Sequence, residues 1–235
     1  MLKRTFIVAT LLAAFAGAHA QTLNAGHDYI VEDTGTYGAD TNFMNFGLSG
    51  GKFKGFAALD FDATSLGAVS GVNSAVLTLQ ESDFTSTSSV PVLLTVFAVT
   101  DNVSSLAKGQ SAIIYNDGVP GGLTNQLGTA TQLGTFLFNP NSLTNGGLSS
   151  QQDAINLTTG LGSIASLIDS SNHIVRLVIV TNETGEVTFA GAGTSSGGTA
   201  SAYIPTLALT PAPEPASMAL LALGVAGIAA RKRRK

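Results

Sequence analysis

The run Ile174-Val-Arg-Leu-Val-Ile-Val180 decides the fold class of this chain. Six of its seven residues are apolar and five are β-branched, which is typical of a short strand rather than of a helix. A nearly continuous apolar run of this length predicts a central strand that is covered on both faces. Upstream, Ala75-Val-Leu-Thr-Leu79 alternates instead, so its first, third and fifth side chains share one face. The two patterns together predict a layered β-protein.

The rest of the body follows the same rule. Runs rich in Val, Ile, Thr and Phe recur between turns rich in Gly, Asn, Ser and Asp, which is typical of short antiparallel strands. The sequence predicts strands at His27–Glu32, Lys52–Phe61, Asn73–Glu81, Val90–Val99, Gln126–Phe138, Ala154–Leu157, His173–Thr181, Glu186–Gly191 and Tyr203–Leu209.

One stretch has helical periodicity. Apolar residues at positions 161, 164, 167 and 168 follow Thr158 and Thr159, whose hydroxyls are suited to cap a helix. We expect a short helix over Gly160–Asp169 that lies across one end of a sandwich. Its apolar stripe is interpreted as core packing rather than as a binding face.

The N-terminus has the layout of a secretory signal peptide. Lys3 and Arg4 precede an apolar run from Thr5 to Ala16, and Ala18-His-Ala20 forms an A-x-A cleavage site. We expect cleavage after Ala20, with the Sec translocon and signal peptidase as partners.

The C-terminus has a second, different layout. Pro213-Glu214-Pro215 precedes an apolar run from Ala216 to Ala230, which spans 15 residues. As a helix, that run reaches about 22 Å at ~1.5 Å per residue, short of the ~30 Å core of a bilayer. A cluster of five basic residues ends the chain and would hold that end in the cytoplasm. Those residues are Arg231, Lys232, Arg233, Arg234 and Lys235.

This tail resembles the PEP-CTERM sorting signal of Gram-negative bacteria. The resemblance implies that an exosortase, a membrane-embedded enzyme similar to cysteine transpeptidases, recognises and removes the tail. It also implies transient anchoring in the inner membrane, then delivery of the body to the cell surface or extracellular matrix. The alternative is an ordinary C-terminal membrane anchor.

These boundaries divide the chain into three parts: a signal peptide at 1–20, a β-sandwich domain at 21–210 and the sorting signal at 211–235. The predicted fold class is all-β, a two-sheet antiparallel sandwich of jelly-roll-like form with one short helix. An N-terminal signal helix and a C-terminal hydrophobic helix flank it.

The body is acidic and has no cysteine. Between the two terminal segments there are 14 acidic residues and only four basic ones, which gives a net charge of −10. The basic residues are Lys52, Lys54, Lys108 and Arg176. This charge disfavours nucleic acid and anionic membrane as partners. Without disulfides, an exported domain depends on its hydrophobic core for stability.

A second resemblance covers roughly residues 26–210. Five stretches, in order, are similar to segments of the DNRLRE-type jelly-roll module. They are Asp28–Ile30, Phe56–Leu79, Ile113–Pro120, Ala154–Thr159 and Ile204–Leu209. There are three departures: Tyr115 stands where that family usually has Trp, Asn156 stands where it usually has Asp, and the predicted helix lacks the family's usual Trp. The family includes alginate-type carbohydrate-binding modules and surface stalk modules, so the resemblance implies the fold more directly than a ligand.

The sequence holds no complete catalytic constellation. The body has two histidines, His27 and His173, each near a predicted strand start. Gly193-Thr-Ser-Ser-Gly197 satisfies G-x-S-x-G, but no histidine follows it to complete the hydrolase order Ser, Asp, His. We therefore predict no catalytic residues and no enzymatic activity.

Four carboxylates are candidate ligands of a structural calcium ion. Asp60 and Asp62 flank Phe61 on a predicted strand and so share one face, while Asp33 and Asp40 lie in a Gly-rich loop. The alternative is that Asp60 and Asp62 mark the strand exit and accept hydrogen bonds from turn amides. No other cofactor is predicted.

The candidate glycan site is Tyr115 with Asn116 and Asp117, because an aromatic ring packs on a sugar face while polar groups bind its hydroxyls. Tyr37 and Tyr203 are further candidate aromatics, and rim packing is the alternative role for each tyrosine.

Three functional hypotheses remain. The first is a non-enzymatic exported surface or matrix protein associated with exopolysaccharide or biofilm. The second is a lectin-like module with a defined glycan pocket. The third is a polysaccharide-degrading enzyme, which the small number of His, Arg and Lys residues disfavours.

Overall fold

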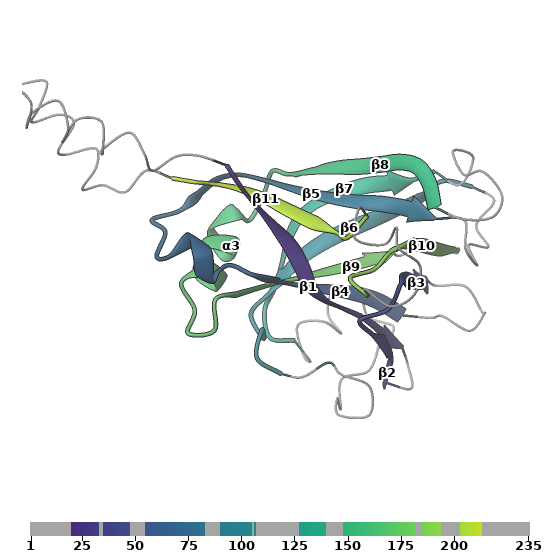
Figure 1. Cartoon of the computed structure of the whole chain (residues 1–235), viewed down its shortest axis with the longest axis horizontal. Coiled ribbons are helices and arrows are strands. Elements are labelled where there is room, and N and C mark those ends of the chain that lie inside the picture. The colour runs from purple at the N-terminus through teal and green to yellow at the C-terminus, as the bar shows by residue number, and fades with distance from the viewer. Residues whose placement is uncertain are drawn as a thin grey trace, which may run out of the picture.

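The computed structural model describes residues 20–32, 35–47, 55–82, 90–104, 106, 127–139, 148–181, 185–193 and 203–212. These residues form eleven antiparallel strands, a 3₁₀ turn and an α-helix (Figure 1). The strands are β1 (Gln21–Glu32), β2 (Gly35–Ala39), β3 (Phe43–Gly47), β4 (Gly55–Asp62), β5 (Val72–Ser82), β6 (Val92–Val99), β7 (Ala130–Phe138), β8 (Leu148–Leu157), β9 (Ile174–Thr181), β10 (Glu186–Ala190) and β11 (Thr206–Pro211). The 3₁₀ turn is η1 (Thr64–Leu66), and the helix is α3 (Leu161–Ile168).

β1 belongs to both layers of a sandwich. Its first four residues pair with β11, while residues from Ala25 onward pair with β4. The register shifts between Ala25 and His27, and such bulges are where strands bend from one sheet into another. Figure 1 shows β1 running diagonally from the layer of β11, β5 and β8 to the layer of β4 and β9.

Each layer has a defined strand order. One contains β8, β5, β11 and the start of β1, and the other contains β2, the rest of β1, β4, β9, β6 and β7. β10 joins β3 to the far end of β5 through the pairing of Phe189 with Glu81. The predicted all-β antiparallel sandwich is therefore confirmed. Both predicted terminal helices lie outside the described residues.

The main hydrophobic core fills the space between the layers. Phe189 packs edge-on against Phe138, with ring centroids 5.5 Å apart, and stacks with Phe46 at 6.3 Å. On β5, Ala75, Leu77 and Leu79 are buried while the residues between them are half-exposed, as the alternation predicts.

A second hydrophobic cluster covers the outer face of the β4–β9 layer, and we call it the outer cluster. Tyr29, Phe56, Phe97, Val178 and neighbouring side chains of the sheet pack there with Leu106 and Leu127. β9 lies between β4 and β6 and is buried on both faces, so the prediction of a doubly covered central strand is confirmed.

The short helix is confirmed, but its predicted cap is wrong. Ile164, Ala165, Leu167 and Ile168 are buried in the main core, so the apolar stripe does serve packing. The N-cap is Gly160 in the left-handed conformation, and no side chain caps the helix. A Cβ on Gly160 would lie 2.7 Å from Thr131 Cγ2, so the close approach to β7 selects glycine. Thr159 instead donates its hydroxyl hydrogen bond to the carbonyl of Gln132.

All nine predicted strands overlap an observed strand, with shifted ends. β1 begins at Gln21 rather than His27, and β8 begins at Leu148 rather than Ala154, because pairing with β11 and β5 extends them. β7 and β11 begin later than predicted, at Ala130 and Thr206.

Two observed strands, β2 and β3, fall in the stretch that the sequence predicts as a Gly- and Asn-rich loop. Each strand mixes strand-favouring residues (Thr and Tyr in β2, Phe in β3) with Gly, Ala or Asn, so pairing with β1 and β10 decides that they form strands. Within the described residues, no helix has both the length and the apolar character needed to span a membrane.

Leu77→Ala is expected to cost about 2–5 kcal/mol of unfolding free energy, because the side chain is fully buried between the layers. Val76→Ala, one residue along and half-exposed, is expected to cost less than about 1 kcal/mol. Urea denaturation followed by circular dichroism measures both. Equal costs would contradict the assignment of inner and outer faces on β5.

Candidate functional site

The outer face of the β4–β9 layer contains a buried ion pair. Arg176 donates from Nε and Nη2 to the two carboxylate oxygens of Asp60, each at 2.7 Å. The two residues are direct cross-strand partners on β9 and β4, and their side chains are 3% and 7% exposed. The remaining nitrogen of Arg176, Nη1, donates to the carbonyls of Asp101 and Ser104. The pair therefore ties the segment that follows β6 to the sheet.

The aromatic ring of Tyr29 lies beside this ion pair. The guanidinium carbon is 5.8 Å from the ring centroid, within range of a cation–π contact. Burial, then the negative charge of Asp60, raises the pKa of Tyr29 to about 12, so its phenol stays protonated at neutral pH. Burial acts to lower the pKa of Arg176. The hydrogen bonds to Asp60 and the negative charge of Asp60 outweigh burial, so the pKa of Arg176 is raised. This arrangement holds Arg176 charged inside a largely apolar surface.

His27 and Asp40 form a second contact on the same face. His27 Nδ1 lies 2.8 Å from Asp40 Oδ1, and both side chains are more than half exposed. The imidazole stacks on Tyr29, with ring centroids 6.1 Å apart. Asp40 has a φ of +51°, and its N–H donates to the carbonyl of Asp28. The contact joins β1 to the turn after β2.

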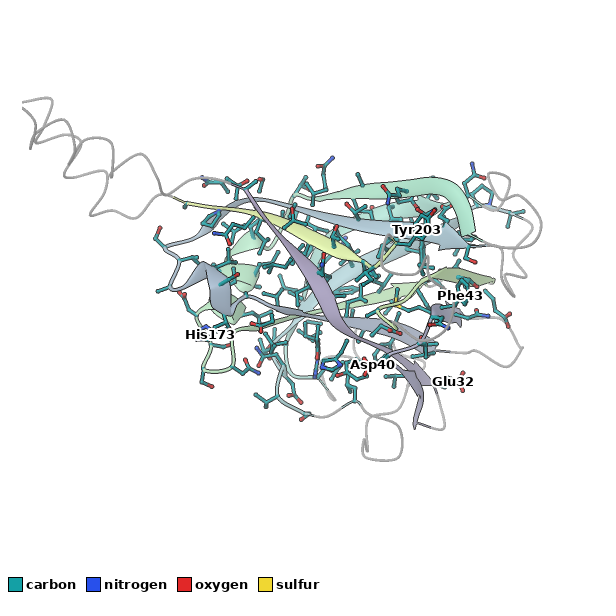
Figure 2. All side chains as sticks on the ribbon, viewed as in Figure 1. Glu32, Asp40, Phe43, His173 and Tyr203 are labelled. Carbon is teal, nitrogen blue, oxygen red and sulfur yellow. The ribbon has the colours of Figure 1, made fainter. Side chains whose placement is uncertain are left out.

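The second histidine of the body is remote from the first. His173 lies at the end of the sandwich that carries α3, apart from Asp40 (Figure 2). Its Nδ1 is 2.6 Å from the carbonyl of Ile168, and its backbone has a φ of +54°. It therefore sits in the turn between α3 and β9 rather than on a strand.

The predicted calcium ligands make separate contacts. Asp40 contacts His27, Asp60 binds Arg176, and Asp62 accepts a hydrogen bond from the Thr64 amide at 2.8 Å. The hydrogen bonds from Thr64 lower the pKa of Asp62, so this carboxylate acts as the alternative interpretation describes. Among the described residues, no three His, Cys, Asp or Glu side chains cluster to hold a metal ion. Asp33 lies outside them, and a calcium site in its loop stays a prediction.

The candidate glycan residues Tyr115, Asn116 and Asp117 also lie outside the described residues. The segment that carries them is flanked by Leu106 and Leu127, both buried in the outer cluster. Tyr203 is half-buried ahead of β11, and Tyr37 lies in β2. The glycan site therefore stays a prediction.

Asp28 is a buried carboxylate that the sequence does not single out. Its two oxygens accept hydrogen bonds from the Thr41 hydroxyl at 2.6 Å and the Ala192 amide at 2.8 Å. Burial raises its pKa, although these two hydrogen bonds act in the opposite direction. A Cβ on Gly191 would lie 2.2 Å from the Thr41 carbonyl oxygen, which explains the glycine there. Asp28 therefore joins three segments that are distant along the chain.

The start of β1 and the end of β11 lie at one end of the sandwich. Gln21, the predicted first residue after signal cleavage, pairs with Leu209. Beyond Leu209, Pro211 pairs with Val72, and the Ala212 amide donates to the Gly71 carbonyl at 2.8 Å. Ser70 Oγ donates to the Ala212 carbonyl at 3.3 Å. The hydrogen bonds of the described domain therefore extend as far as Ala212, the residue that precedes Pro213.

Residues 211–234, which begin at this end of the sandwich, match a known family that is described as the PEP-CTERM protein-sorting motif. The chain carries a PEP-CTERM sorting motif. The predicted resemblance of the tail is thereby confirmed, and the match begins at the last residue of β11. No curated protein matches the chain. The similarity of the body to the DNRLRE-type module stays a prediction.

The PEP-CTERM motif implies an exported protein with a transient C-terminal anchor. Such a protein is held by its tail before sorting, and the processing partner is an exosortase. The motif includes Pro213, Glu214 and Pro215, together with the apolar run and most of the basic cluster.

Arg176→Met is expected to lower the unfolding free energy by about 3–5 kcal/mol, because it leaves the Asp60 carboxylate buried without its cation. The double variant Asp60→Leu/Arg176→Met removes both charges and is expected to recover much of this loss. Urea denaturation of the two variants and the parent protein measures the difference. A single variant as stable as the parent would show that the ion pair does not hold this face together.

Proposed function

We propose that this chain is a non-enzymatic surface or extracellular-matrix protein that an exosortase delivers into exopolysaccharide or biofilm. The proposal rests on the PEP-CTERM motif, which begins where the last strand of the sandwich ends. Export by the Sec pathway and signal peptidase follows from the N-terminal Lys-Arg, apolar run and A-x-A site.

The arrangement of β1 and β11 supports processing at both ends of a folded body. Antiparallel pairing of Gln21 with Leu209 brings the residues next to both predicted processing sites to one end of the sandwich. The body is therefore able to fold while its signal peptide and its tail both remain in one membrane. A domain whose termini lay at opposite ends would need long linkers to do this.

The composition of the body supports a passive role in a hydrated matrix. Its net charge of −10 favours solubility, and it opposes adsorption to anionic surfaces. The buried carboxylates Asp28 and Asp60 are engaged in contacts that hold the fold together. A non-enzymatic role fits these assignments.

A lectin-like module is the second proposal. The aromatic and polar triplet Tyr115-Asn-Asp117 lies in a segment whose flanking residues Leu106 and Leu127 are both anchored on the outer face of the sheet. A segment whose two ends are held by a rigid sheet is a common place for a binding site. Because the body is acidic, a neutral or calcium-bridged glycan is a better partner than a bare polyuronate.

Intact-mass analysis of exported protein is expected to find a chain that begins near Gln21 and ends at about Pro213. Replacing Pro213, Glu214 and Pro215 with alanines should retain the tail without affecting removal of residues 1–20. This variant separates the two processing events. Surface protein that still carries residues 216–235 would support a simple membrane anchor and contradict exosortase sorting.

Tyr115→Ala is expected to weaken retention on a column of neutral exopolysaccharide roughly tenfold, because the loss of ring stacking costs about 1–2 kcal/mol. Tyr115→Phe keeps the ring and should bind nearly as well as the parent. Thermal unfolding of both variants checks that the domain stays folded. Reduced stability with unchanged retention would make Tyr115 a packing residue and contradict the lectin-like proposal.

A further inference from the structure

The folded domain and the sorting motif have no spacer between them. The last backbone hydrogen bond of the described chain, from the Ala212 amide to the Gly71 carbonyl, lies one residue before Pro213. Pro211, the first residue of the motif, is itself the last residue of β11. The motif therefore starts inside the sheet.

Enzymes that act on peptide segments commonly bind them as extended chains, through backbone hydrogen bonds like those of an added strand. The residues that would occupy such a site upstream of the Pro-Glu-Pro triplet are Thr210, Pro211 and Ala212. In the folded domain, these residues pair with Ser74, Val72 and Gly71. β5 therefore occupies one backbone edge of this segment, and an enzyme cleft that encloses the segment on both edges requires its release.

The pairing of β11 changes at Leu209. Leu207 and Leu209 are fully buried, and residues 206–209 pair with β5 on one side and β1 on the other. Beyond Leu209, the registered partners lie on β5 alone, and the register shifts between Thr210 and Pro211. Thr210, Pro211 and Ala212 are each only half-buried, and Pro211 has no N–H to donate. The strand end is therefore held far less firmly than the strand centre.

We propose that residues 210–212 must detach from β5 before the exosortase can act, so that local opening of this strand end controls sorting. The inference rests on the proposed function, because it concerns regulation of the same tail. Opening stops at Leu209, whose burial keeps the rest of β11 in the sheet. The three released residues extend the reach of the motif by about 10 Å, at ~3.3 Å per residue. The body can then remain folded throughout sorting.

The chain offers a direct way to lock this strand end. A Cβ on Gly71 would lie 3.5 Å from the Cβ of Ala212, within the range found in disulfides. The chain has no native cysteine, so Gly71→Cys/Ala212→Cys has a single possible pairing. The oxidising environment outside the cytoplasm favours its formation. Electrophoresis with and without reductant verifies the bond.

In cells that express the exosortase, the locked variant is expected to lose residues beyond Pro213 at least about tenfold more slowly than the parent chain. Gly71→Cys alone should be processed like the parent. A third variant carries both cysteines and a Gly-Ser linker of eight residues between Ala212 and Pro213. It should be processed at the parent rate, since the linker supplies the reach that the lock removes.

The outcomes separate the two claims. A parent chain that keeps its tail would contradict the proposed function, and this inference with it. If the parent chain and the locked variant are both processed, and at the same rate, the inference is overturned but the proposed function stands. A linker variant that stays unprocessed would also overturn it, because the defect would then not arise from the locked strand end.

Discussion

The pairing of β1 with strands of both layers is the constraint on which the rest of the architecture depends. Its first four residues pair with β11 in one layer, and the remainder pairs with β4 in the other. One strand therefore fixes how the two layers are joined. It also brings together the start of β1 and the end of β11, because Gln21 pairs with Leu209 in antiparallel register. The position of the sorting motif at this end of the sandwich follows from that pairing.

On the outer face of the β4–β9 layer, a buried charged side chain holds a neighbouring segment of the chain against the sheet. Arg176 is the one arginine of the body, and Asp60, its cross-strand partner, satisfies it in bidentate geometry. Its remaining nitrogen holds the carbonyls of Asp101 and Ser104, next to the outer cluster with Leu106 and Leu127. The ion pair thereby joins a long connection to the sheet. The same surface flanks the segment that carries the proposed glycan residues.

The C-terminal tail and the folded body have different roles in this protein. The tail carries the PEP-CTERM sorting motif, which is a contiguous stretch of sequence at residues 211–234. The body supplies a stable, acidic sandwich without disulfides. The two parts meet at Pro211 and Ala212, where a strand end and a sorting motif share the same backbone. In the sorting step that we propose, this overlap links the folding of the body to the processing of the tail.

The sequence by itself determined the fold class, the doubly covered strand at Ile174–Val180, the short helix and the sorting motif, because each depends on local periodicity or on a contiguous motif. Only the tertiary structure decided that Asp60 binds Arg176 while Asp62 caps a turn, although alternation places both on one strand face. The strands β2 and β3, the glycine cap of α3 and the meeting of β1 with β11 were likewise decided by partners distant in sequence. Strand register and close backbone approach depend on those partners, and local sequence patterns do not encode them.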